Sequence, residues 1–273
     1  MTATTAPLRS DFLVIGAGIA GASVAYWLAP HGSVTVLERE SQPGYHSTGR
    51  SAALFMESYG TPQVRALTMA SHAFLANPPQ GFATHSLLTP RGALMVAAPG
   101  QQALLDEHWE ILRAMAPEAE LLTAQQACER VPVLRPEMVI GAVYEPGAAD
   151  MDVHAIHQGY LRGIRQAGGK LVCDAEVRAI TRHGDVWRVE AGQAVYESPV
   201  VLNAAGAWAD VIARQAGVSP LGLQPCRRSA FVFQPPAGVD SHGWPMVHSA
   251  DESWYIKPDA GMLLGSPANA DPV

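Results

Sequence analysis

The chain has 273 residues, a length that suits one large or two ordinary domains with a substantial core. Hydrophobic residues make up 48% and charged residues 16%, which is typical of a globular protein and excludes a disordered one. The formal net charge of -7 excludes the overall positive charge typical of nucleic-acid-binding proteins. No apolar run approaches the roughly 20 residues of a membrane-spanning helix, so we expect no integral membrane segment.

The three cysteines lie far apart and form no CxxC pair: Cys128, Cys173 and Cys226. This pattern favours reduced thiols over disulfides or a zinc site. Residues 1–10 are small and polar and lack the apolar centre of a signal peptide, which predicts a loose tail. The sequence therefore predicts a cytoplasmic protein.

The first elements form a βαβ unit. Residues 11–15 (DFLVI) are a short apolar run that stops at a glycine, as a buried parallel strand does. Residues 19–29 read as a helix of small residues that ends at Pro30, and residues 33–38 (SVTVLE) read as the second strand.

The rest of the chain alternates between helices and short strands. Residues 41–53 are rich in Gly and Ser and predict a loop. Helices are expected over residues 61–75, 101–115, 153–167 and 207–216, the first capped by Thr61 and the third by Asp152. Strands are expected within residues 170–203, 228–234 and 253–265, with a hairpin turn at Pro258–Gly261.

These elements predict an α/β protein with two domains. A Rossmann-like domain takes residues 1–80 and 150–220. A mixed α+β substrate domain, dominated by antiparallel sheet, takes residues 81–149 and 221–273.

A glycine-rich turn carries the strongest functional signal. The GxGxxG motif, Gly16-Ala17-Gly18-Ile19-Ala20-Gly21, follows a strand and opens a helix. The first glycine permits a tight turn, the second lets the backbone approach a pyrophosphate, and the third lets helix and strand pack closely. The helix N-terminus then faces the negative charge of the phosphates.

Glu38 ends the second strand 22 residues after Gly16. A carboxylate at this point can accept hydrogen bonds from ribose hydroxyls and disfavours a 2′-phosphate. The motif and the acid predict a dinucleotide site, but they do not separate NAD from FAD.

Two further segments distinguish FAD from NAD, because they resemble a known family of enzymes. The loop Gly44–Ala53 (GYHSTGRSAA) and the turn Asn203–Trp208 (NAAGAW) resemble the D-amino acid oxidase-like (DAO) family of FAD enzymes. The likeness runs from about Asp11 to Val273 and is greatest to the D-arginine dehydrogenase branch.

This resemblance implies FAD as the cofactor and a set of contacts to it. The loop would lie against the flavin and the pyrophosphate, the second turn would approach the cofactor with its backbone, and Val177 would contact the adenine through its main chain. The implied cofactor-binding residues are Gly16, Gly18, Ile19, Ala20, Gly21, Glu38, Arg39, Ser47, Thr48, Gly49, Arg50, Ser51, Ala52, Val177, Ala205, Gly206 and Trp208.

The resemblance also implies three residues on the substrate side. Arg228, Tyr255 and Tyr59 match active-site positions of the family. An arginine fork can hold a substrate carboxylate with paired hydrogen bonds, and tyrosine hydroxyls can support it.

Two positions depart from the arginine-using members. Leu54 stands where they have a histidine, and Ala93 stands where they have the acid that receives the guanidinium. A cationic side chain would be left unpaired there, which is costly. We therefore expect a preference for neutral or apolar D-amino acids over D-arginine.

The predicted function is the oxidation of a D-amino acid by hydride transfer to the flavin, giving an imino acid and then a 2-oxo acid and ammonia. A secondary amine, glycine or a 2-hydroxy acid as substrate is the alternative within the same fold. The electron acceptor, a quinone or oxygen, stays open. We expect no metal site, because Asp152 is better used as a helix cap than as a ligand beside Asp150, His154 and His157.

Family members continue for roughly another hundred residues after the point that matches Val273. The resemblance thus leaves open a chain that lacks a C-terminal part, or a non-catalytic flavin-binding subunit, as a further alternative.

Overall fold

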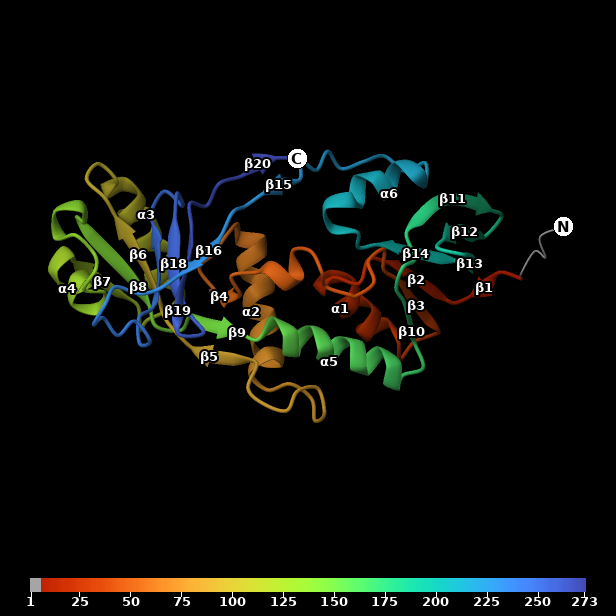
Figure 1. Cartoon of the computed structure of the whole chain (residues 1–273), viewed down its shortest axis with the longest axis horizontal. Helices are drawn as coiled ribbons and strands as arrows, with labels where there is room; N and C mark the ends of the chain where they lie inside the picture. Colours follow the sequence, from red (N-terminus) through yellow and green to blue (C-terminus); the bar gives the residue numbers. More distant parts are fainter. Residues whose placement is uncertain (1–5) are drawn as a thin grey trace. The chain divides into compact units, whose positions relative to one another are not determined.

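The computed structural model describes residues 6–273, and residues 1–5 of the predicted N-terminal tail lie outside the described part (Figure 1). The chain forms two compact units. The first takes the residues up to Ser51 with 78–87 and 152–225, and the second takes 52–77, 88–151 and 226–273. The predicted domain bounds differ from these units mainly at residues 52–77, which belong to the second unit.

A parallel sheet forms the centre of the first unit. Its order is β10 (Lys170–Val172), β3 (Val34–Leu37), β2 (Phe12–Ile15), β14 (Val200–Asn203), and every neighbouring pair is parallel. Strands buried on both faces read as continuous apolar runs, which is why FLVI and VTVL form these two central strands.

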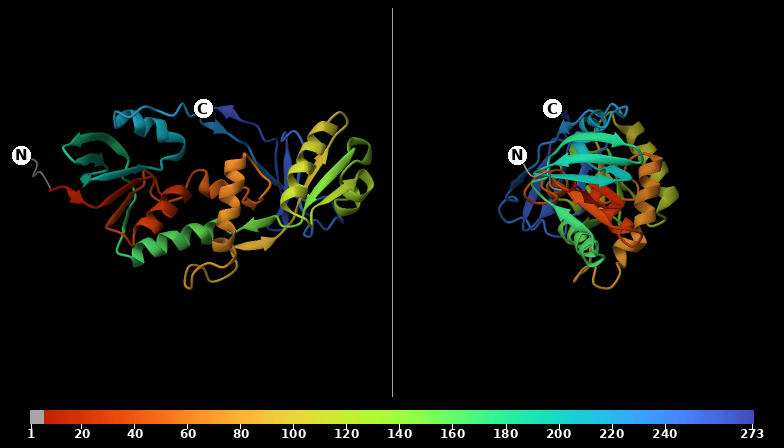
Figure 2. Two further views of the ribbon diagram at one scale, coloured as in Figure 1. Left: turned by 180° about the vertical axis from the view of Figure 1, so that it is seen from behind. Right: turned by 90° about the vertical axis from the view of Figure 1, so that its right-hand side faces the viewer.

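Two helices pack against one another beside this sheet, α1 (Ile19–Leu28) and α5 (Val153–Gln166) (Figure 2). As predicted, Asp152 caps α5, and its side chain accepts a hydrogen bond from the Ala155 N–H. Gly163 of α5 lies so close to the Tyr26 ring of α1 that a Cβ there would approach it to 2.3 Å.

An antiparallel meander packs against the parallel sheet. It consists of β11 (Val177–His183), β12 (Val186–Ala191) and β13 (Ala194–Ser198), and β1 (Leu8–Arg9) joins it in parallel. The prediction of a loose tail is therefore wrong at β1, because these two residues pair with β13. The core between sheet and meander includes Leu13, Leu37 and Val189.

A short helix closes the first unit, α6 (Ala209–Gln215), and it differs from the predicted helix at its start. Residues Gly206–Trp208 form a separate 3-10 turn, η3, because Gly206 adopts a positive φ of 54°. Within the loop predicted over residues 41–53, Thr48–Arg50 form one further 3-10 turn, η1.

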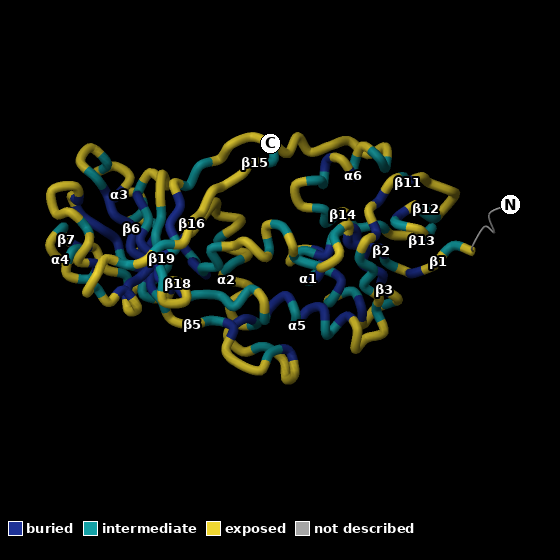
Figure 3. Tube along the Cα trace, viewed as in Figure 1, coloured by how far each residue is buried: buried dark blue, intermediate teal, exposed yellow. Residues whose placement is uncertain are grey.

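The second unit is built on a seven-stranded mixed sheet. Its order is β16 (Phe231–Phe233), β19 (Met262–Ser266), β18 (Tyr255–Asp259), β17 (Met246–Ser249), β6 (Ala93–Ala97), β8 (Gly141–Glu145), β7 (Glu120–Thr123). Only β17 and β6 are parallel. The central strands β6 and β8 are almost wholly buried, as Figure 3 shows.

Each face of this sheet carries its own apolar core. Met95 and Val143 pack under α3 (Gln102–Met115), whose Leu105 and Leu112 are buried. Leu94 packs on the opposite face with Ala127 of α4 (Ala124–Arg130) and with Val139, which follows η2 (Pro136–Met138). Alternate side chains of a strand point to opposite faces, which divides ALMVA between the two cores.

Smaller elements complete the second unit. A three-stranded antiparallel sheet has the order β4 (Leu54–Phe55), β9 (Ala149–Met151), β5 (Leu88–Pro90), and β15 (Cys226–Arg227) pairs with β20 (Asp271–Pro272). Helix α2 (Pro62–Ala76) begins as predicted, with Thr61 as its cap and Pro62 at its first position.

The predicted hairpin between β18 and β19 is present, but its turn is shorter than expected. Asp259 pairs with Met262, so Pro258 and Asp259 belong to the strand and the turn is Ala260-Gly261. Both turn residues have positive φ, 48° and 81°. Among residues 6–273, no helix is long and apolar enough to cross a membrane.

Candidate functional site

The glycine-rich turn of the first unit joins β2 to α1 with very little space around it. A Cβ on Gly16 would lie 2.4 Å from the Ala204 oxygen, and one on Gly21 would lie 1.9 Å from the Gly16 oxygen. Gly16 also has a φ of 102°. These contacts leave room only for glycine, so the turn is held close to the strand and to the second glycine-containing turn.

The start of α1 is electrostatically open to an anion. Gly18 is its N-cap without a side-chain cap, and the first turn contains no acidic residue. A helix N-terminus carries partial positive charge on its free N–H groups. The Thr48 hydroxyl accepts the N–H of Ile19 at 2.9 Å, so the predicted flavin loop lies against this helix start.

Two side chains from distant parts of the chain bind Ala17, inside the turn. One Glu38 carboxylate oxygen accepts the Ala17 N–H at 2.8 Å, and the other accepts the Glu40 N–H at 3.0 Å. Glu38 is only 7% exposed. A carboxylate oxygen has two lone pairs, so a ribose hydroxyl would share Glu38 with these backbone groups.

His157 of α5 binds the other side of Ala17. Its Nε2 lies 2.8 Å from the Ala17 carbonyl oxygen, and because a carbonyl only accepts, Nε2 carries the proton. The residue is 3% exposed, and burial lowers the pKa of its imidazole. A neutral histidine therefore supports the turn at neutral pH.

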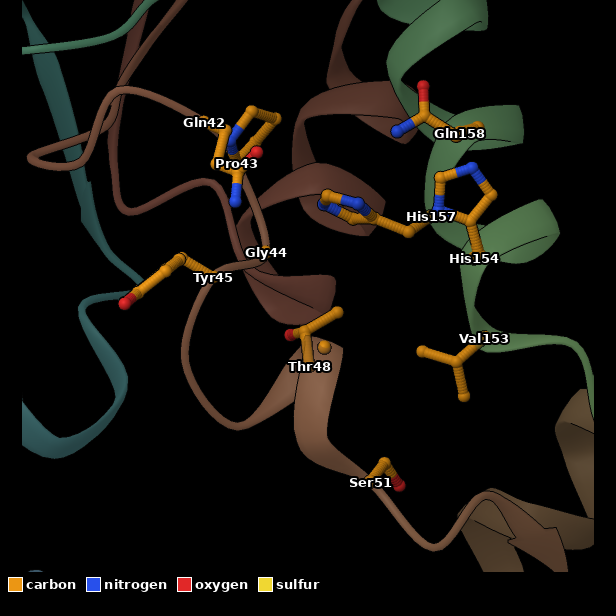
Figure 4. Close-up of a pocket in the computed structure, with 11 residues that line it drawn as sticks. Gln42, Pro43, Gly44, Tyr45, Thr48, Ser51, Val153, His154, His157 and Gln158 are labelled. Atoms are coloured by element: carbon orange, nitrogen blue, oxygen red, sulfur yellow. The ribbon is translucent and has the colours of Figure 1, made fainter. Parts of the chain in front are cut away.

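A cavity of about 440 Å³ lies between the 42–51 loop and α5 (Figure 4). Thr48, Gly49 and Ser51 line it from the loop, and His154 and His157 line it from the helix. Figure 4 shows the His157 side chain extending from α5 toward the loop. The cavity thus joins three predicted flavin-loop residues to a helix that was not predicted to take part.

A second group of predicted cofactor residues gathers near Glu38. The Arg39 guanidinium lies over the Trp208 ring, 4.8 Å from its centroid, and Nη2 is 3.3 Å from Glu176. Val177, beside Glu176, has its side chain buried in the core and is paired with Ala191 of β12. Residues 39, 177 and 208 are therefore neighbours in space, although they are far apart in sequence.

Taken one by one, these features fit FAD. The turn offers a backbone cradle and a helix N-terminus for a pyrophosphate, and Arg39 with Trp208 offers a flat cationic and aromatic surface. Of the predicted loop residues, Ser47 precedes η1 in the first unit and Arg50 is its last residue, and the Arg50 guanidinium lies 5.0 Å from the Tyr45 ring centroid. Ala52 is the first residue of the second unit.

The predicted substrate residue Tyr255 lies in the second unit, half-buried, on the α3 face of the large sheet. It is paired directly with His248 on β17 and with Ser266 on β19. His248 is paired in turn with Met95 of the α3 core. Directly opposed residues share a face, so Tyr255, His248 and Ser266 form one row.

Arg228 lies in the exposed stretch before β16. Its Nε donates to the Asn269 carbonyl at 3.3 Å, and its two Nη groups have no hydrogen-bond partner within residues 6–273. The Ser266 hydroxyl donates to the Ser229 carbonyl at 2.6 Å. The structure therefore brings Arg228 and Tyr255 to the same end of the sheet, linked through Ser266.

The two positions that depart from arginine-using members also meet. Ala93 is 2% exposed and packs with Met56 and Ala148, and Leu54 packs against the same small cluster. Tyr59, the third predicted substrate residue, is 52% exposed in the segment between β4 and α2.

A buried carboxyl group lies beside Ala93. Glu145 is paired with Ala93 across β8 and β6 and is 4% exposed. It accepts hydrogen bonds from the Ser58 hydroxyl and from the Glu57 N–H. Burial raises the pKa of Glu145 above its usual range, opposed by these hydrogen bonds.

Asp150 forms ion pairs with two cationic side chains. Its carboxylate lies 2.7 Å from Arg91 Nε and 2.7 Å from Lys257 Nζ, and Lys257 is 5% exposed. Arg91 also donates to the carbonyls of His242 and Trp244. This cluster fastens the three-stranded sheet to the large sheet of the second unit.

Sequence reasoning missed His157, His248, Glu145 and Lys257. A weak signal existed for His157, because it falls on the buried stripe of α5 with Leu161 and Ile164 at helical spacing. For the other three we find no sequence signal, since strand pairing alone determines what they face.

The sheet, the glycine turn and the acid after β3 define a dinucleotide-binding protein. The profile of the DAO family, described as FAD dependent oxidoreductase, matches residues 11–272. The chain therefore belongs to the DAO family of FAD-dependent oxidoreductases, and FAD is its cofactor. The family resemblance and the predicted fold class are confirmed.

Individual relatives differ in what they act on. The chain is 28% identical over 217 residues to an L-2-hydroxyglutarate dehydrogenase of Salmonella houtenae, covering 77% of this chain and 50% of the relative. It is 26% identical over 298 residues to FAD-dependent oxidoreductase domain-containing protein 1 of Bos taurus, covering 93% and 61%. The glycine oxidase of Geobacillus kaustophilus shares the fold, with a TM-score of 0.81, 21% identity and coverage of 97% and 72%. The chain spans about half the length of the Salmonella houtenae relative and about three fifths of the length of the Bos taurus relative.

Proposed function

We propose that this protein oxidises D-amino acids with neutral or apolar side chains. The first unit would hold FAD and the second would hold the substrate. These are the roles expected of the Rossmann-like domain and the substrate domain that the sequence predicts. The resemblance to the D-arginine dehydrogenase branch supports a D-configured amino acid. Within residues 6–273 none of the three cysteines forms a disulfide, which agrees with the proposed cytoplasmic location.

One observation carries the proposed side-chain preference. Leu54 and Ala93 lie in one apolar cluster with Met56 and Ala148, so the histidine and the acid of arginine-using members are replaced together at one place. The nearby Glu145 is already bonded to Ser58 and Glu57. An unpaired guanidinium beside this cluster would be costly, whereas an apolar side chain would gain contacts.

The chain's own residues would bind and orient the substrate. Arg228, with both Nη groups available, would hold the carboxylate, and the Tyr255 hydroxyl would add a further hydrogen bond. Tyr59 would line the site. When bound, FAD accepts the hydride that leaves the α-carbon, and the imino acid is then hydrolysed to the 2-oxo acid and ammonia.

The direct test is anaerobic reduction of the purified protein loaded with FAD. Adding D-methionine should bleach the visible flavin band, whereas L-methionine should leave it unchanged. Arg228→Ala should raise the concentration of D-methionine required for half-maximal reduction by about tenfold or more, because a charged hydrogen-bonded pair is lost. Bleaching by neither isomer would contradict the proposal and favour a non-catalytic flavin-binding subunit.

The side-chain preference has its own test in Ala93→Glu, with Ala93→Gln as the control of equal size. The carboxylate should raise the rate of reduction by D-arginine relative to D-methionine, and the amide should not. If D-arginine already reduces the flavin of the unaltered protein faster than D-methionine does, the proposed preference is wrong.

A 2-hydroxy acid is the second candidate, favoured by the likeness to the L-2-hydroxyglutarate dehydrogenase. The same carboxylate clamp serves either an α-amino or an α-hydroxy acid. Lactate and 2-hydroxyglutarate, tested as both enantiomers, with sarcosine and glycine for the amine alternative, would distinguish these substrates in the same anaerobic assay.

A further inference from the structure

Three consecutive peptide groups of the glycine turn have separate partners. The N–H of Ala17 donates to Glu38, the carbonyl of Ala17 accepts from His157, and the N–H of Ile19 donates to Thr48. Between them, the N–H of Gly18 takes no hydrogen-bond partner within residues 6–273. Gly18 is partly exposed, so its N–H is available to a ligand.

The direction of the Gly18 N–H follows from that of the Ala17 carbonyl. A peptide group is planar and trans, so the carbonyl of one residue and the N–H of the next point in opposite directions. The Ala17 carbonyl points to His157 on α5, and the Gly18 N–H therefore points away from α5. Glu38 fixes the preceding peptide group in the same manner through the Ala17 N–H.

We propose that His157 is a positioning residue for the cofactor: by holding the Ala17 carbonyl, it aims the Gly18 N–H at the pyrophosphate of FAD. The role is indirect, because the imidazole binds the turn and the turn binds the phosphate. It concerns the cofactor alone and is independent of the substrate proposed above.

The imidazole is well placed to hold this peptide group rigidly. Its Cε1 would lie 2.9 Å from a Cβ on Gly44, so the ring is held between the glycine turn and the 42–51 loop. A side chain that is 3% exposed and in contact on two sides keeps one orientation. Tilting the Ala17 carbonyl would break its hydrogen bond to His157. Because the Gly18 N–H belongs to the same peptide group, this hydrogen bond also holds the direction of that N–H.

The test compares three substitutions that differ in reach and in hydrogen-bonding capacity. The amide nitrogen of His157→Gln can stand at the place of Nε2 and donate to Ala17. The amide of His157→Asn is shorter and stands nearer the place of Nδ1, and His157→Leu donates nothing. The measurement is the Kd of FAD, from quenching of flavin fluorescence, on apoprotein checked by circular dichroism.

We expect the Kd of FAD to rise about five- to tenfold in His157→Leu and His157→Asn, the loss of one positioned hydrogen bond. His157→Gln should stay within about twofold of the unaltered protein. ADP, which carries the diphosphate without the flavin, should lose affinity by the same factor as FAD in isothermal titration. Ile164→Val, a buried change on α5 away from the turn, controls for loosened helix packing and should leave both affinities unchanged.

Several results would overturn the proposal. An unchanged Kd in His157→Leu would show that the turn needs no support from α5. Equal weakening in His157→Gln and His157→Leu, or in Ile164→Val, would show that packing and not the hydrogen bond matters. Weakened FAD binding with unchanged ADP binding would place the effect away from the pyrophosphate.

Discussion

Glu145 is an ionisable residue in a nearly closed environment. Its carboxyl group is 4% exposed and satisfies the Ser58 hydroxyl and the Glu57 N–H, which precede the proposed substrate residue Tyr59. Burial raises its pKa, so the folded state binds the proton more tightly than the unfolded chain does. The stability that Glu145 contributes is therefore fully present below its unfolded pKa and is lost as pH rises through the folded pKa.

Two substitutions at Glu145 should separate hydrogen bonding from ionisation. Glu145→Ala leaves buried partners unsatisfied and should lower the free energy of unfolding by about 1–3 kcal/mol. Glu145→Gln keeps a polar partner and cannot ionise, so its stability relative to the unaltered protein should increase from pH 4.5 to pH 8. Urea denaturation at both pH values measures this, and a pH-independent difference would contradict it.

At the same scale, residue identity alone indicated what is unusual about the proposed substrate site. Leu54 and Ala93 were singled out separately by comparison with arginine-using family members. Only the pairing of β4 with β9 and of β6 with β8 brings them into one cluster. The sequence therefore suggested each replacement, and the structure added that the two residues lie at the same place.

The N-caps of two helices were the most predictable features of the elements. Thr61 and Asp152 cap α2 and α5 as expected, because a cap depends on residues only three positions away. The central strands β6, β8 and β17 were not predicted. Short apolar runs such as ALMVA suit a buried strand and a buried helix segment equally well, and pairing with distant strands decides between them.

The β18–β19 hairpin gives a prediction at the scale of one element. Ala260 adopts a φ of 48°, a conformation that costs an alanine about 1 kcal/mol. Because Asn-Gly is the preferred pair for such a two-residue turn, Ala260→Asn should raise the free energy of unfolding by about 1 kcal/mol.

Gly261→Ala is the matched control for the hairpin, since it places a Cβ at a φ of 81°. It should lower the free energy of unfolding by about 1 kcal/mol, measured by the same urea denaturation. Equal stability of both variants and the unaltered protein would mean that the turn is not held in this conformation.

For the whole molecule, buried histidines should make stability depend on pH. Burial lowers the pKa of His248 from 6.5 to about 4, with the neighbouring His108 contributing, and burial also lowers those of His108 and His157. Between the lowered pKa values of the folded state and the ordinary value of 6.5, the unfolded chain therefore binds more protons than the folded one. Stability is fully present above about pH 6.5 and is lost as pH falls through the folded pKa values.

His248→Phe should remove part of this loss. The unaltered protein should lose on the order of 3 kcal/mol through His248 alone between pH 7 and pH 4, and the variant should show a shallower decline. The measurement is the free energy of unfolding from urea denaturation across this range. Parallel pH curves for the two proteins would show that His248 is not held neutral by the fold.

By itself, the sequence determined the βαβ unit, the glycine turn, the helix caps and, through two loop segments, the family and its cofactor. These features depend on backbone conformations that a few neighbouring residues impose, and a glycine or a cap residue reveals them directly. The tertiary structure alone decided which side chains hold that turn and which side chains lie together on one face of the large sheet. Glu38 and His157 reach Ala17 across 21 and 140 residues, and Tyr255 meets His248 only through strand register. Such contacts depend on how distant segments close on one another, and no local pattern of residues encodes them.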